Sequence, residues 1–505
     1  MDDKIGFDNE KYLEEQKSAI LERVKSSNSR LYLEFGGKII FDYHAARVLP
    51  GFKPNTKVQL IQQLKDQAEV ILCIYAGDIA RKKIRADFGI TYDSDVLKTI
   101  DDLSEWGIRI RAIVITRFDN QQSCIVFKNK LERRNIKVYT HKYTKGYPTD
   151  IDMVVSEEGY GANEYIEIQK PIVIVIGPGP GSGKLATCLS QLYHDHKKGI
   201  HSYYAKYETF PIWNLPLNHQ VNVAYEAATA DLKDIVLIDH FHLEAYNKKA
   251  VNYNRDIEAF PLLKRILEKI TDSPTAYKSP TDMGVNRAGF SIINDEVVRE
   301  AASQEIIRRY FRYACEYVMG FAEKDTVQKI ELIMKNINIK IENRKVVLPA
   351  RQSAIEAQKK EKGREGIYCG AAIELKDGSI VTGNNSSLMH ATSSLILNTV
   401  KRLAGIPKQI DLLPLSTLES LSYFKKDILK GKMISLDLEE TLIALITSTS
   451  LNPAAKVAIE KLKDLNGCEV HLTHLPTPGD AAGLRKLGVN LTSDPVFPSK
   501  DLYIT

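Results

Sequence analysis

The sequence predicts an α/β protein with a doubly wound, mostly parallel sheet, followed by a helical portion and a smaller α/β domain. Strand-like apolar runs alternate with helix-like segments in the first half of the chain, which is the order that produces a parallel sheet. All five residues of Ile172–Ile176 are aliphatic, and such a run is typical of a strand buried on both faces. A glycine-rich turn follows this run, and a helix-compatible segment follows the turn.

The elements before this run fit the same class. A surface helix is expected over residues 8–25, and a hairpin that turns at Gly36 and Gly37 is expected next. Strands expected at residues 70–75, 110–116 and 136–141 alternate with helices expected at 93–106 and 123–134. This order predicts a Rossmann or P-loop-like sheet, in which ligands bind beyond the carboxyl ends of the strands.

The turn after Ile172–Ile176 has the composition of a phosphate-binding loop. Glycines let a chain turn with its N–H groups unshielded, and the start of a helix adds the positive end of its dipole. The P-loop spacing is matched in part, because Pro178 stands at the motif's first glycine and Leu185 at its magnesium-binding hydroxyl. A purely structural turn is the alternative. The residues expected to bind a nucleotide or another phosphate are Gly177, Gly179, Gly181, Ser182, Gly183 and Lys184.

A second apolar run, residues 235–238, predicts another buried strand beside the first, and it ends in Asp239. P-loop proteins keep a magnesium-side aspartate at this place. We therefore expect Asp239 and Lys184 to face one cleft as catalytic residues, with Mg²⁺ as the accompanying ion. The structural alternative is that Asp239 caps a helix.

The residues after Asp239 indicate a different chemistry if the segment is extended. His240, His242 and Glu244 then lie on one face, and together with Asp239 they would form the transition-metal site of a metal-dependent hydrolase. If the segment is helical, these side chains fan apart, and hydrogen-bonded histidines are expected instead.

Polar residues are also concentrated in two later segments, 252–256 and 278–282. Polar side chains at such density suggest a substrate site, and hydrogen bonds that fix loops are the alternative. Within these segments, Arg255 and Asp256 are the residues expected to be catalytic.

The composition is that of an ordinary globular chain of 505 residues, with 44% hydrophobic and 26% charged residues. The formal net charge of +5 comes without a long Lys/Arg block, which argues against nucleic acid as a partner. No long apolar run suggests a membrane. Six widely spaced cysteines form no metal motif and favour reduced thiols in the cytoplasm. A phosphorylated small molecule remains the expected partner, and a homo-oligomer is compatible with the composition.

From residue 294 the pattern is helical, and residues 350–366 are expected to connect two domains. A hairpin around Asp377 and Gly378, followed by a helix near His390, resembles the opening of the cytidine-deaminase fold. Thr392 replaces the glutamate of that fold's H-x-E motif, and C-x-x-C is absent. The predicted parts are a nucleotide-binding-like domain (1–293), a helical portion (294–349) and a deaminase-like domain without zinc ligands (350–505).

Long phrases of the chain resemble a known bacterial family, among them GPGPGSGKLATCLSQLYH, KYETFPIWNLPLNH and SPTDMGVNRAGF. The family is uncharacterised protein family 0371, also called domain-of-unknown-function family 1846. The resemblance covers essentially the whole chain and implies a cytoplasmic protein with the architecture given above. It implies no reaction. Three function classes therefore stay open: an enzyme for a nucleotide or another phosphorylated small molecule, a metal-dependent hydrolase, and a non-catalytic sensor or scaffold.

Overall fold

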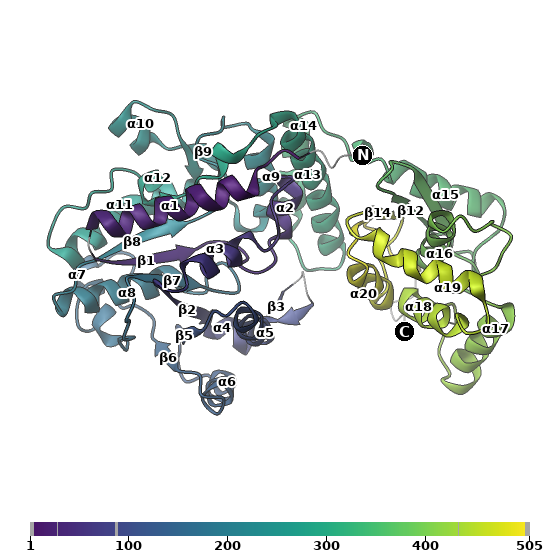
Figure 1. Cartoon of the computed structure of the whole chain (residues 1–505), viewed down its shortest axis with the longest axis horizontal. Helices are drawn as coiled ribbons and strands as arrows, with labels where there is room; N and C mark the ends of the chain where they lie inside the picture. Colours follow the sequence, from purple (N-terminus) through teal and green to yellow (C-terminus); the bar gives the residue numbers. More distant parts are fainter. Residues whose placement is uncertain (1–4, 28, 86–88, 433, 500–505) are drawn as a thin grey trace. The chain divides into compact units, whose positions relative to one another are not determined.

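The computed structural model describes residues 5–27, 29–85, 89–432 and 434–499 (Figure 1). These residues divide into two compact units. The N-terminal unit contains residues 5–226 and 234–302, and the C-terminal unit contains residues 227–233 and 303–499. The division at residue 302 lies inside a long helix, α13 (Asp295–Val318).

The N-terminal unit is built on a parallel sheet of seven strands in the order β11-β8-β1-β7-β2-β5-β6. The predicted strand Ile172–Ile176 is β7, and it lies in the interior of the sheet between β1 and β2, as predicted. Strand pairing in parallel therefore joins segments that are far apart in the sequence. The strands are β1 (Arg30–Phe35), β2 (Ala68–Tyr75), β5 (Ile110–Thr116), β6 (Val138–His141), β7 (Ile172–Ile176), β8 (Ser202–Tyr207) and β11 (Gly284–Val285).

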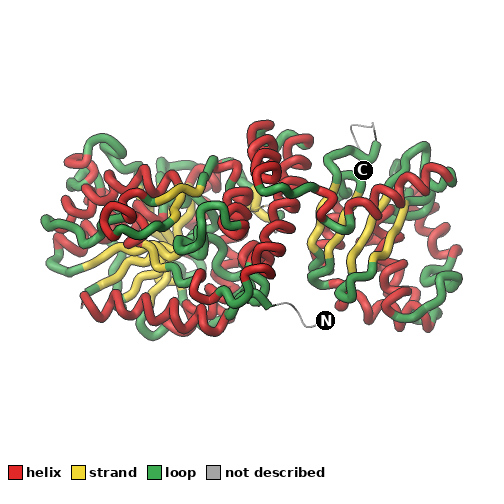
Figure 2. The backbone as a smooth tube through the Cα atoms, turned by 90° about the horizontal axis from the view of Figure 1, so that it is seen from above, coloured by secondary structure: helices red, strands yellow, loops and turns green. Residues whose placement is uncertain are grey.

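Helices cover both faces of this sheet, because side chains alternate along each strand and both sets are buried (Figure 2). One face packs against α1, α3, α5 and α6, and the other packs against α7, α8 and α11. The predicted α/β class is confirmed. The helices are α1 (Asn9–Ser27), α2 (Tyr43–Val48), α3 (Thr56–Leu64), α4 (Ala76–Ala80), α5 (Tyr92–Glu105), α6 (Gln122–Glu132), α7 (Ile151–Val154), α8 (Lys184–Lys197), α9 (Gln220–Ala228), α10 (His240–Tyr246), α11 (Asn254–Thr271) and α12 (Pro280–Met283).

Two short antiparallel ribbons complete the strands of this unit. They pair β3 (Ile84–Arg85) with β4 (Ile90–Thr91), and β9 (Val236–Ile238) with β10 (Val251–Tyr253). Helix α10 connects the two strands of the second ribbon.

The predicted hairpin at Gly36 and Gly37 was wrong. No second strand follows β1, and the chain continues through a loop into α2. Instead, β1 pairs in parallel with β7 and β8, and the N–H of Gly36 donates to the carbonyl oxygen of Tyr207 at 2.8 Å. A short apolar run does not show which strand it pairs with. The strands that pair with β1 are distant from it in the sequence.

The C-terminal unit contains a four-stranded mixed sheet in the order β13-β12-β14-β15. Strand β12 is antiparallel to both of its neighbours, and β14 and β15 are parallel. The predicted hairpin around Asp377 and Gly378 is confirmed, as is the helix that begins after His390. The strands are β12 (Gly370–Glu374), β13 (Ile380–Asn384), β14 (Glu469–Leu472) and β15 (Asn490–Ser493). The helices after α13 are α14 (Lys324–Asn336), α15 (Val347–Lys359), α16 (Ala391–Leu403), α17 (Leu415–Tyr423), α18 (Leu438–Ser448), α19 (Pro453–Ile459) and α20 (Pro478–Lys486).

The segment 350–366, expected to connect two domains, belongs mainly to helix α15 of the C-terminal unit. Ala350, Ser353 and Ala357 are buried at helical spacing, and Ala350 packs against Ala372 of β12. The charged residues between them occupy the solvent side of the helix, which gave the segment its polar composition.

All six cysteines are buried and free. In the described part of the chain, the structure contains no helix with both the length and the apolar character needed to cross a membrane.

Candidate functional site

The loop after β7 lies where the connections of the sheet change sides. The connection from β1 to β2 carries α3 across one face, whereas the connection from β7 to β8 carries α8 across the other face. In open α/β sheets, ligands bind at such a point, beyond the carboxyl ends of the strands. The loop therefore occupies the position at which a ligand of this sheet is expected.

Glycine is required at several positions of the loop. The backbone angle φ is +72° at Gly181 and +90° at Gly183, a region that other residues rarely adopt. A Cβ atom at Gly183 would lie 2.5 Å from Cγ2 of Thr116, and one at Gly177 would lie 2.3 Å from Oγ of Ser182. The loop is therefore closely packed around its own backbone.

Two residues at the end of β5 hold the loop in place. The hydroxyl of Thr116 donates to the carbonyl oxygen of Ser182 at 2.9 Å, and the guanidinium of Arg117 donates to the carbonyl oxygen of Gly181. Arg117 also lies over the ring of Tyr75, with its Cζ 3.8 Å from the ring centroid. Both hydrogen bonds use carbonyl oxygens, so they fix the loop without using its N–H groups.

Helix α8 begins at Lys184 without a side-chain cap, because its N-cap residue is Gly183. The first N–H groups of a helix have no acceptor inside the helix, and the helix dipole makes them attract an anion. The Nζ atom of half-buried Lys184 lies 3.5 Å from the carbonyl oxygen of Gly179. Ser182 is 1% exposed, and its hydroxyl has no partner among the described residues. The start of α8 thus combines uncapped N–H groups, one ammonium and one buried hydroxyl, all of which are hydrogen-bond donors.

The predicted partnership of Lys184 and Asp239 was based on a wrong strand assignment. Residues 236–238 form β9, which is not part of the main sheet, and Leu237 and Ile238 are 42% and 39% exposed. Asp239 is the N-cap of α10, and its carboxylate accepts from the N–H of His242 at 3.0 Å and the hydroxyl of Thr281 at 2.6 Å. Lys184 and Asp239 therefore do not follow neighbouring strands of one sheet, and Asp239 has the capping role.

The extended geometry expected for the metal site is also wrong. His240, His242 and Glu244 lie on α10, and helical positions two residues apart point to roughly opposite sides. The Nδ1 atom of His242 lies 3.1 Å from the hydroxyl of Ser279. Within the described ranges, no group of three or more His, Cys, Asp or Glu side chains is arranged to hold a metal ion.

Arg255 and Asp256, by contrast, lie at the carboxyl edge of the main sheet. They occupy the first turn of α11, and a carboxylate oxygen of Asp256 lies 2.7 Å from the Nζ of Lys206 near the end of β8. The guanidinium of Arg255 lies 3.5 Å from the carboxylate of Asp234. Asp256 thus belongs to a charged cluster around Lys206, and Arg255 lies next to it in the chain.

We call this cluster the acid–lysine cluster. The Nζ of Lys206 also lies 2.8 Å from the carboxylate of Glu208. On the neighbouring strand β1, Glu34 is in register with Lys206, and its carboxylate accepts from the hydroxyl of Tyr204 at 2.8 Å. The cluster is defined as Glu34, Lys206, Glu208 and Asp256.

The charged groups of the cluster shift one another's pKa values. Burial raises the pKa of the Glu208 carboxyl to about 7, with Lys206 opposing this rise and Asp256 adding to it. Burial acts to lower the pKa of Lys206, but the carboxylates of Asp256, Glu208 and Glu34 outweigh burial and raise it. Lys206 is therefore a fixed cation, and the protonation of Glu208 is poised near neutral pH.

Tyr253, three residues before Asp256, is a buried tyrosine whose hydroxyl forms no hydrogen bond to a described residue. Its exposed fraction is 1%. Burial raises the pKa of Tyr253 well above its usual value, and the charges of Tyr225 and Glu208 raise it further, whereas Arg255 lowers it. The Cζ of Arg255 lies 5.6 Å from the centroid of the Tyr253 ring, and the ring of Tyr225 is 5.7 Å from it.

The loop and the acid–lysine cluster act on the same buried thiols. Burial raises the pKa of Cys188 well above its usual value, Glu34 raises it further, and the ammonium of Lys184 lowers it. Burial likewise raises the pKa of Cys73 to about 12, against the effect of Lys184 and with that of Glu34. The loop after β7 and the cluster on β1 and β8 lie at one edge of the sheet, because these three strands are parallel neighbours and both sets of residues come at or just after their carboxyl ends.

A small pocket adjoins the loop on the opposite face of the sheet. It is lined by Gly177 and Pro178 of the loop, by Lys38 and Phe41 after β1, and by Lys98 of α5. This pocket is also lined by the carboxylates of Asp95 and Asp102, and Lys98 is paired with Asp102. The two faces of the loop therefore present different residues, with charged groups of both signs on each face.

Comparison with known proteins assigns the chain to a family. The model described as "Domain of unknown function DUF1846, N-terminal" matches residues 5–338, and "Domain of unknown function DUF1846, C-terminal" matches residues 342–503. The chain belongs to the DUF1846 family. Two similar proteins, each described as "UPF0371 protein", come from Clostridium tetani (strain Massachusetts / E88) and Clostridium botulinum (strain Langeland / NCTC 10281 / Type F). They are 55% and 56% identical to the chain over 500 and 501 residues, and each alignment covers 99% of both sequences. The family resemblance expected from the sequence is confirmed.

Sequence reasoning identified the loop, Arg255 and Asp256 but missed three members of the cluster. Glu34 and Lys206 are charged residues inside strands of a buried parallel sheet, and Glu208 follows directly after one of these strands. A charge within an interior strand is a usable signal, because such strands are otherwise nearly continuous apolar runs.

Proposed function

We propose that the N-terminal unit is a Rossmann or P-loop-like domain that binds the phosphate of a nucleotide or another phosphorylated small molecule. The Gly177–Lys184 loop holds the phosphate. The observation that carries the proposal is the start of α8, where a helix without a side-chain cap lies beside Lys184 and the unpartnered, buried hydroxyl of Ser182. First-turn N–H groups and one ammonium are the donors that proteins commonly use for phosphate.

The acid–lysine cluster supports an enzyme acting on this molecule. Carboxyl groups with a pKa near neutral pH are suited to transfer protons, and groups of this kind concentrate at active sites. Glu208 has this property, and it lies at the same edge of the sheet as the loop. Asp256 and Lys206 hold it in an ordered ion pair network.

We assign the C-terminal unit to a deaminase-like fold without the zinc ligands, in a cytoplasmic protein. The support is the hairpin of β12 and β13, the following helix α16, and the antiparallel position of β12 between β13 and β14. Thr392 lies in the first turn of α16, at the place of the glutamate in H-x-E. This unit therefore has no assigned part in the proposed chemistry.

The test is a thermal-shift screen with pyrophosphate, nucleotides and sugar phosphates, with and without Mg²⁺, followed by calorimetry on the best binder. A ligand that binds only the folded protein raises the midpoint. Lys184→Ala should weaken binding by about 1–3 kcal/mol, the range for one charge-assisted hydrogen bond, with little change in stability.

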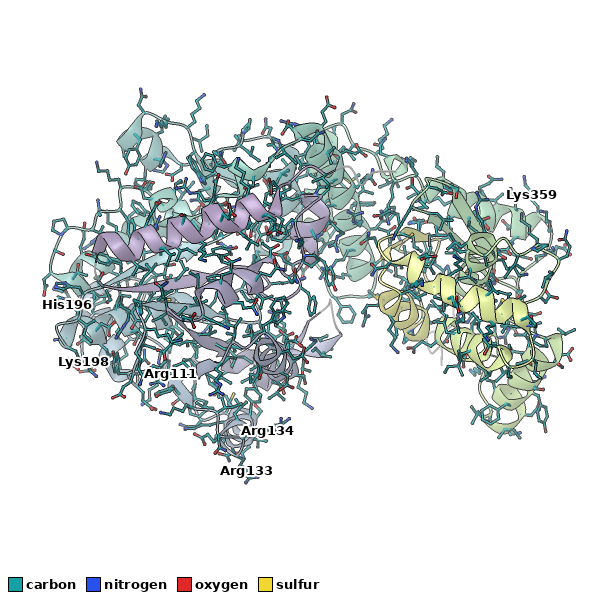
Figure 3. All side chains as sticks on the ribbon, in the orientation of Figure 1. Arg111, Arg133, Arg134, His196, Lys198 and Lys359 are labelled. Atoms are coloured by element: carbon teal, nitrogen blue, oxygen red, sulfur yellow. The ribbon has the colours of Figure 1, made fainter. Side chains whose placement is uncertain are left out.

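The matched control is Lys198→Ala, at the C-terminal end of α8, where Figure 3 shows Lys198 at the periphery of the N-terminal unit. This control should leave binding unchanged. If no phosphorylated compound binds, or if both lysine variants bind as well as the parent, the proposal is wrong. Binding without turnover of the bound compound would instead identify a sensor.

A further inference from the structure

The chemistry beyond the loop indicates which phosphorylated molecule this edge of the sheet accepts. The loop follows β7, the acid–lysine cluster lies on β1 and β8, and β1 separates β7 from β8. Two inter-strand spacings amount to about 10 Å. The distance from the loop to the cluster is therefore comparable to the span of one sugar ring that carries a phosphate.

The cluster can accept hydrogen bonds from such a body. A carboxylate has two acceptor oxygens, and Lys206 occupies Oδ2 of Asp256 and Oε1 of Glu208. The second oxygen of each carboxylate suits the hydroxyl groups of a ligand. Because three carboxylates surround one ammonium, the cluster favours a body that donates hydrogen bonds over a second anion.

The hydroxyl of Tyr253 is an independent sign that a ligand belongs here. A buried polar group without a partner costs about 1–3 kcal/mol, so native structures rarely keep one. Tyr253 is 1% exposed, and its ring centroid lies 5.6 Å from the Cζ of Arg255, the residue next to Asp256 in α11. A ligand hydroxyl group, which both donates and accepts, would satisfy it.

We infer that the ligand is a sugar phosphate, with its phosphate on the Gly177–Lys184 loop and its hydroxyl groups on Asp256, Glu208 and Tyr253. This inference rests on the proposed function. A nucleotide would instead place an aromatic base in the pocket lined by Phe41, Lys38 and Lys98 on the opposite face. The two arrangements use different residues, so they can be separated by mutation.

The experiment measures calorimetric affinities of the full chain for glucose 6-phosphate, ribose 5-phosphate, AMP and cyclohexylmethyl phosphate. The last compound has a similar size but no hydroxyl groups. At least one of the two sugar phosphates should bind tenfold or more tightly than cyclohexylmethyl phosphate, because a site built to bind hydroxyl groups rejects an analogue without them. Tyr253→Phe and Asp256→Asn should each weaken the sugar phosphate by about tenfold and leave cyclohexylmethyl phosphate unchanged.

Three outcomes separate this inference from the function on which it rests. If Lys184-dependent binding is equal for the sugar phosphates and cyclohexylmethyl phosphate, or is unaffected by Tyr253→Phe and Asp256→Asn, the inference is wrong and the phosphate loop stands. If AMP binds most tightly and Phe41→Ala weakens it, the ligand body lies on the opposite face and the inference is again wrong. If neither sugar phosphate binds while another phosphorylated compound of the screen binds in a Lys184-dependent manner, the inference is wrong and the proposed function stands; if no compound of the screen binds, both are wrong.

Discussion

Polar side chains near the sheets of the two units differ in charge and burial: those of the N-terminal unit are charged and partly exposed, whereas a histidine of the C-terminal unit is buried and neutral. In the N-terminal unit, Lys206 is an ion held between Glu208 and Asp256, and these groups are partly exposed. In the C-terminal unit, burial lowers the pKa of His474 to about 4, so this histidine is neutral at neutral pH. Its neighbour Asp480 is fully buried.

In the C-terminal unit, the buried carboxylate of Asp480 is held by hydrogen bonds from the chain itself. Asp480 accepts from the Nδ1 of His390 at 2.8 Å, the N–H of Leu438 at 3.0 Å and the hydroxyl of Thr477 at 2.9 Å. These bonds tie the starts of three helices together. A partly exposed ionic cluster can take up a ligand, whereas a buried carboxylate saturated by its own chain fixes the fold.

The largest expected effect is the loss of the cation in the N-terminal unit. Lys206→Met leaves Glu208 and Asp256 without their common partner, and breaking a buried ion pair on one side costs about 3–5 kcal/mol. Urea unfolding measures this loss. As a control in the C-terminal unit, Lys345→Met removes an exposed pair with Glu374 and should change stability by less than about 1 kcal/mol. Equal losses of stability in the two variants would show that the pairs of Lys206 contribute no more to stability than the exposed pair of Lys345.

The second prediction concerns acid pH in the C-terminal unit. Since the folded pKa of His474 is depressed to about 4 from 6.5, its contribution to stability is present above pH 6.5 and is lost as pH falls toward 4. The loss amounts to about 3 kcal/mol. The groups that act on His474 are Asp480, His390, Asp494 and His471. His474→Gln should flatten the decline in urea stability between pH 6.5 and 4, and an unchanged decline would show that His474 does not cause it.

Glu208 should show the opposite slope over a similar range. Its folded pKa is raised from 4.5 to about 7, so its contribution is present below pH 4.5 and is lost as pH rises toward 7. Glu208→Gln, which keeps the shape and removes the charge, should therefore raise stability at pH 7 relative to the parent more than at pH 4.5. Urea unfolding at the two pH values gives this difference directly. A larger gain at pH 4.5 would mean that Glu208 is ionised throughout this range.

The smallest expected effect separates two buried tyrosines of the N-terminal unit. The hydroxyl of Tyr32 donates to Asp195 at 2.8 Å, so Tyr32→Phe should cost about 1–3 kcal/mol. Tyr253→Phe should cost nothing measurable, because no described partner is lost. Residues kept for a ligand are often suboptimal for stability. A clear loss for Tyr253→Phe would indicate a structural role instead.

The sequence allowed the sheet to be predicted better than the site. The run Ile172–Ile176 and the apolar centre of Ile110–Thr116, residues 112–115, were recognised because burial on both faces leaves no polar positions there. The run 235–238 has a similar composition but forms the exposed ribbon strand β9, since a four-residue run does not specify the sheet to which it belongs. The glycine-rich turn between β7 and α8 was predictable because it is local in sequence.

The acid–lysine cluster was not predictable in the same way. Glu34, Lys206 and Asp256 come from three separate segments, and only the parallel pairing of β1 with β8 and the position of α11 bring them together. Pairing between distant strands depends on the whole sheet, so no local pattern encodes it. Asp239 shows the converse, because a capping aspartate and a catalytic aspartate after a strand look alike in sequence.

Whether the Gly177–Lys184 loop binds phosphate can be decided by a crystal structure of the full chain with the tightest-binding phosphorylated compound of the screen. We expect the phosphate at the start of α8, with its oxygens within about 3 Å of the first-turn N–H groups, the Nζ of Lys184 and the hydroxyl of Ser182. A phosphate bound elsewhere on the N-terminal unit, with the Gly177–Lys184 loop unchanged, would show that this loop is not the phosphate site.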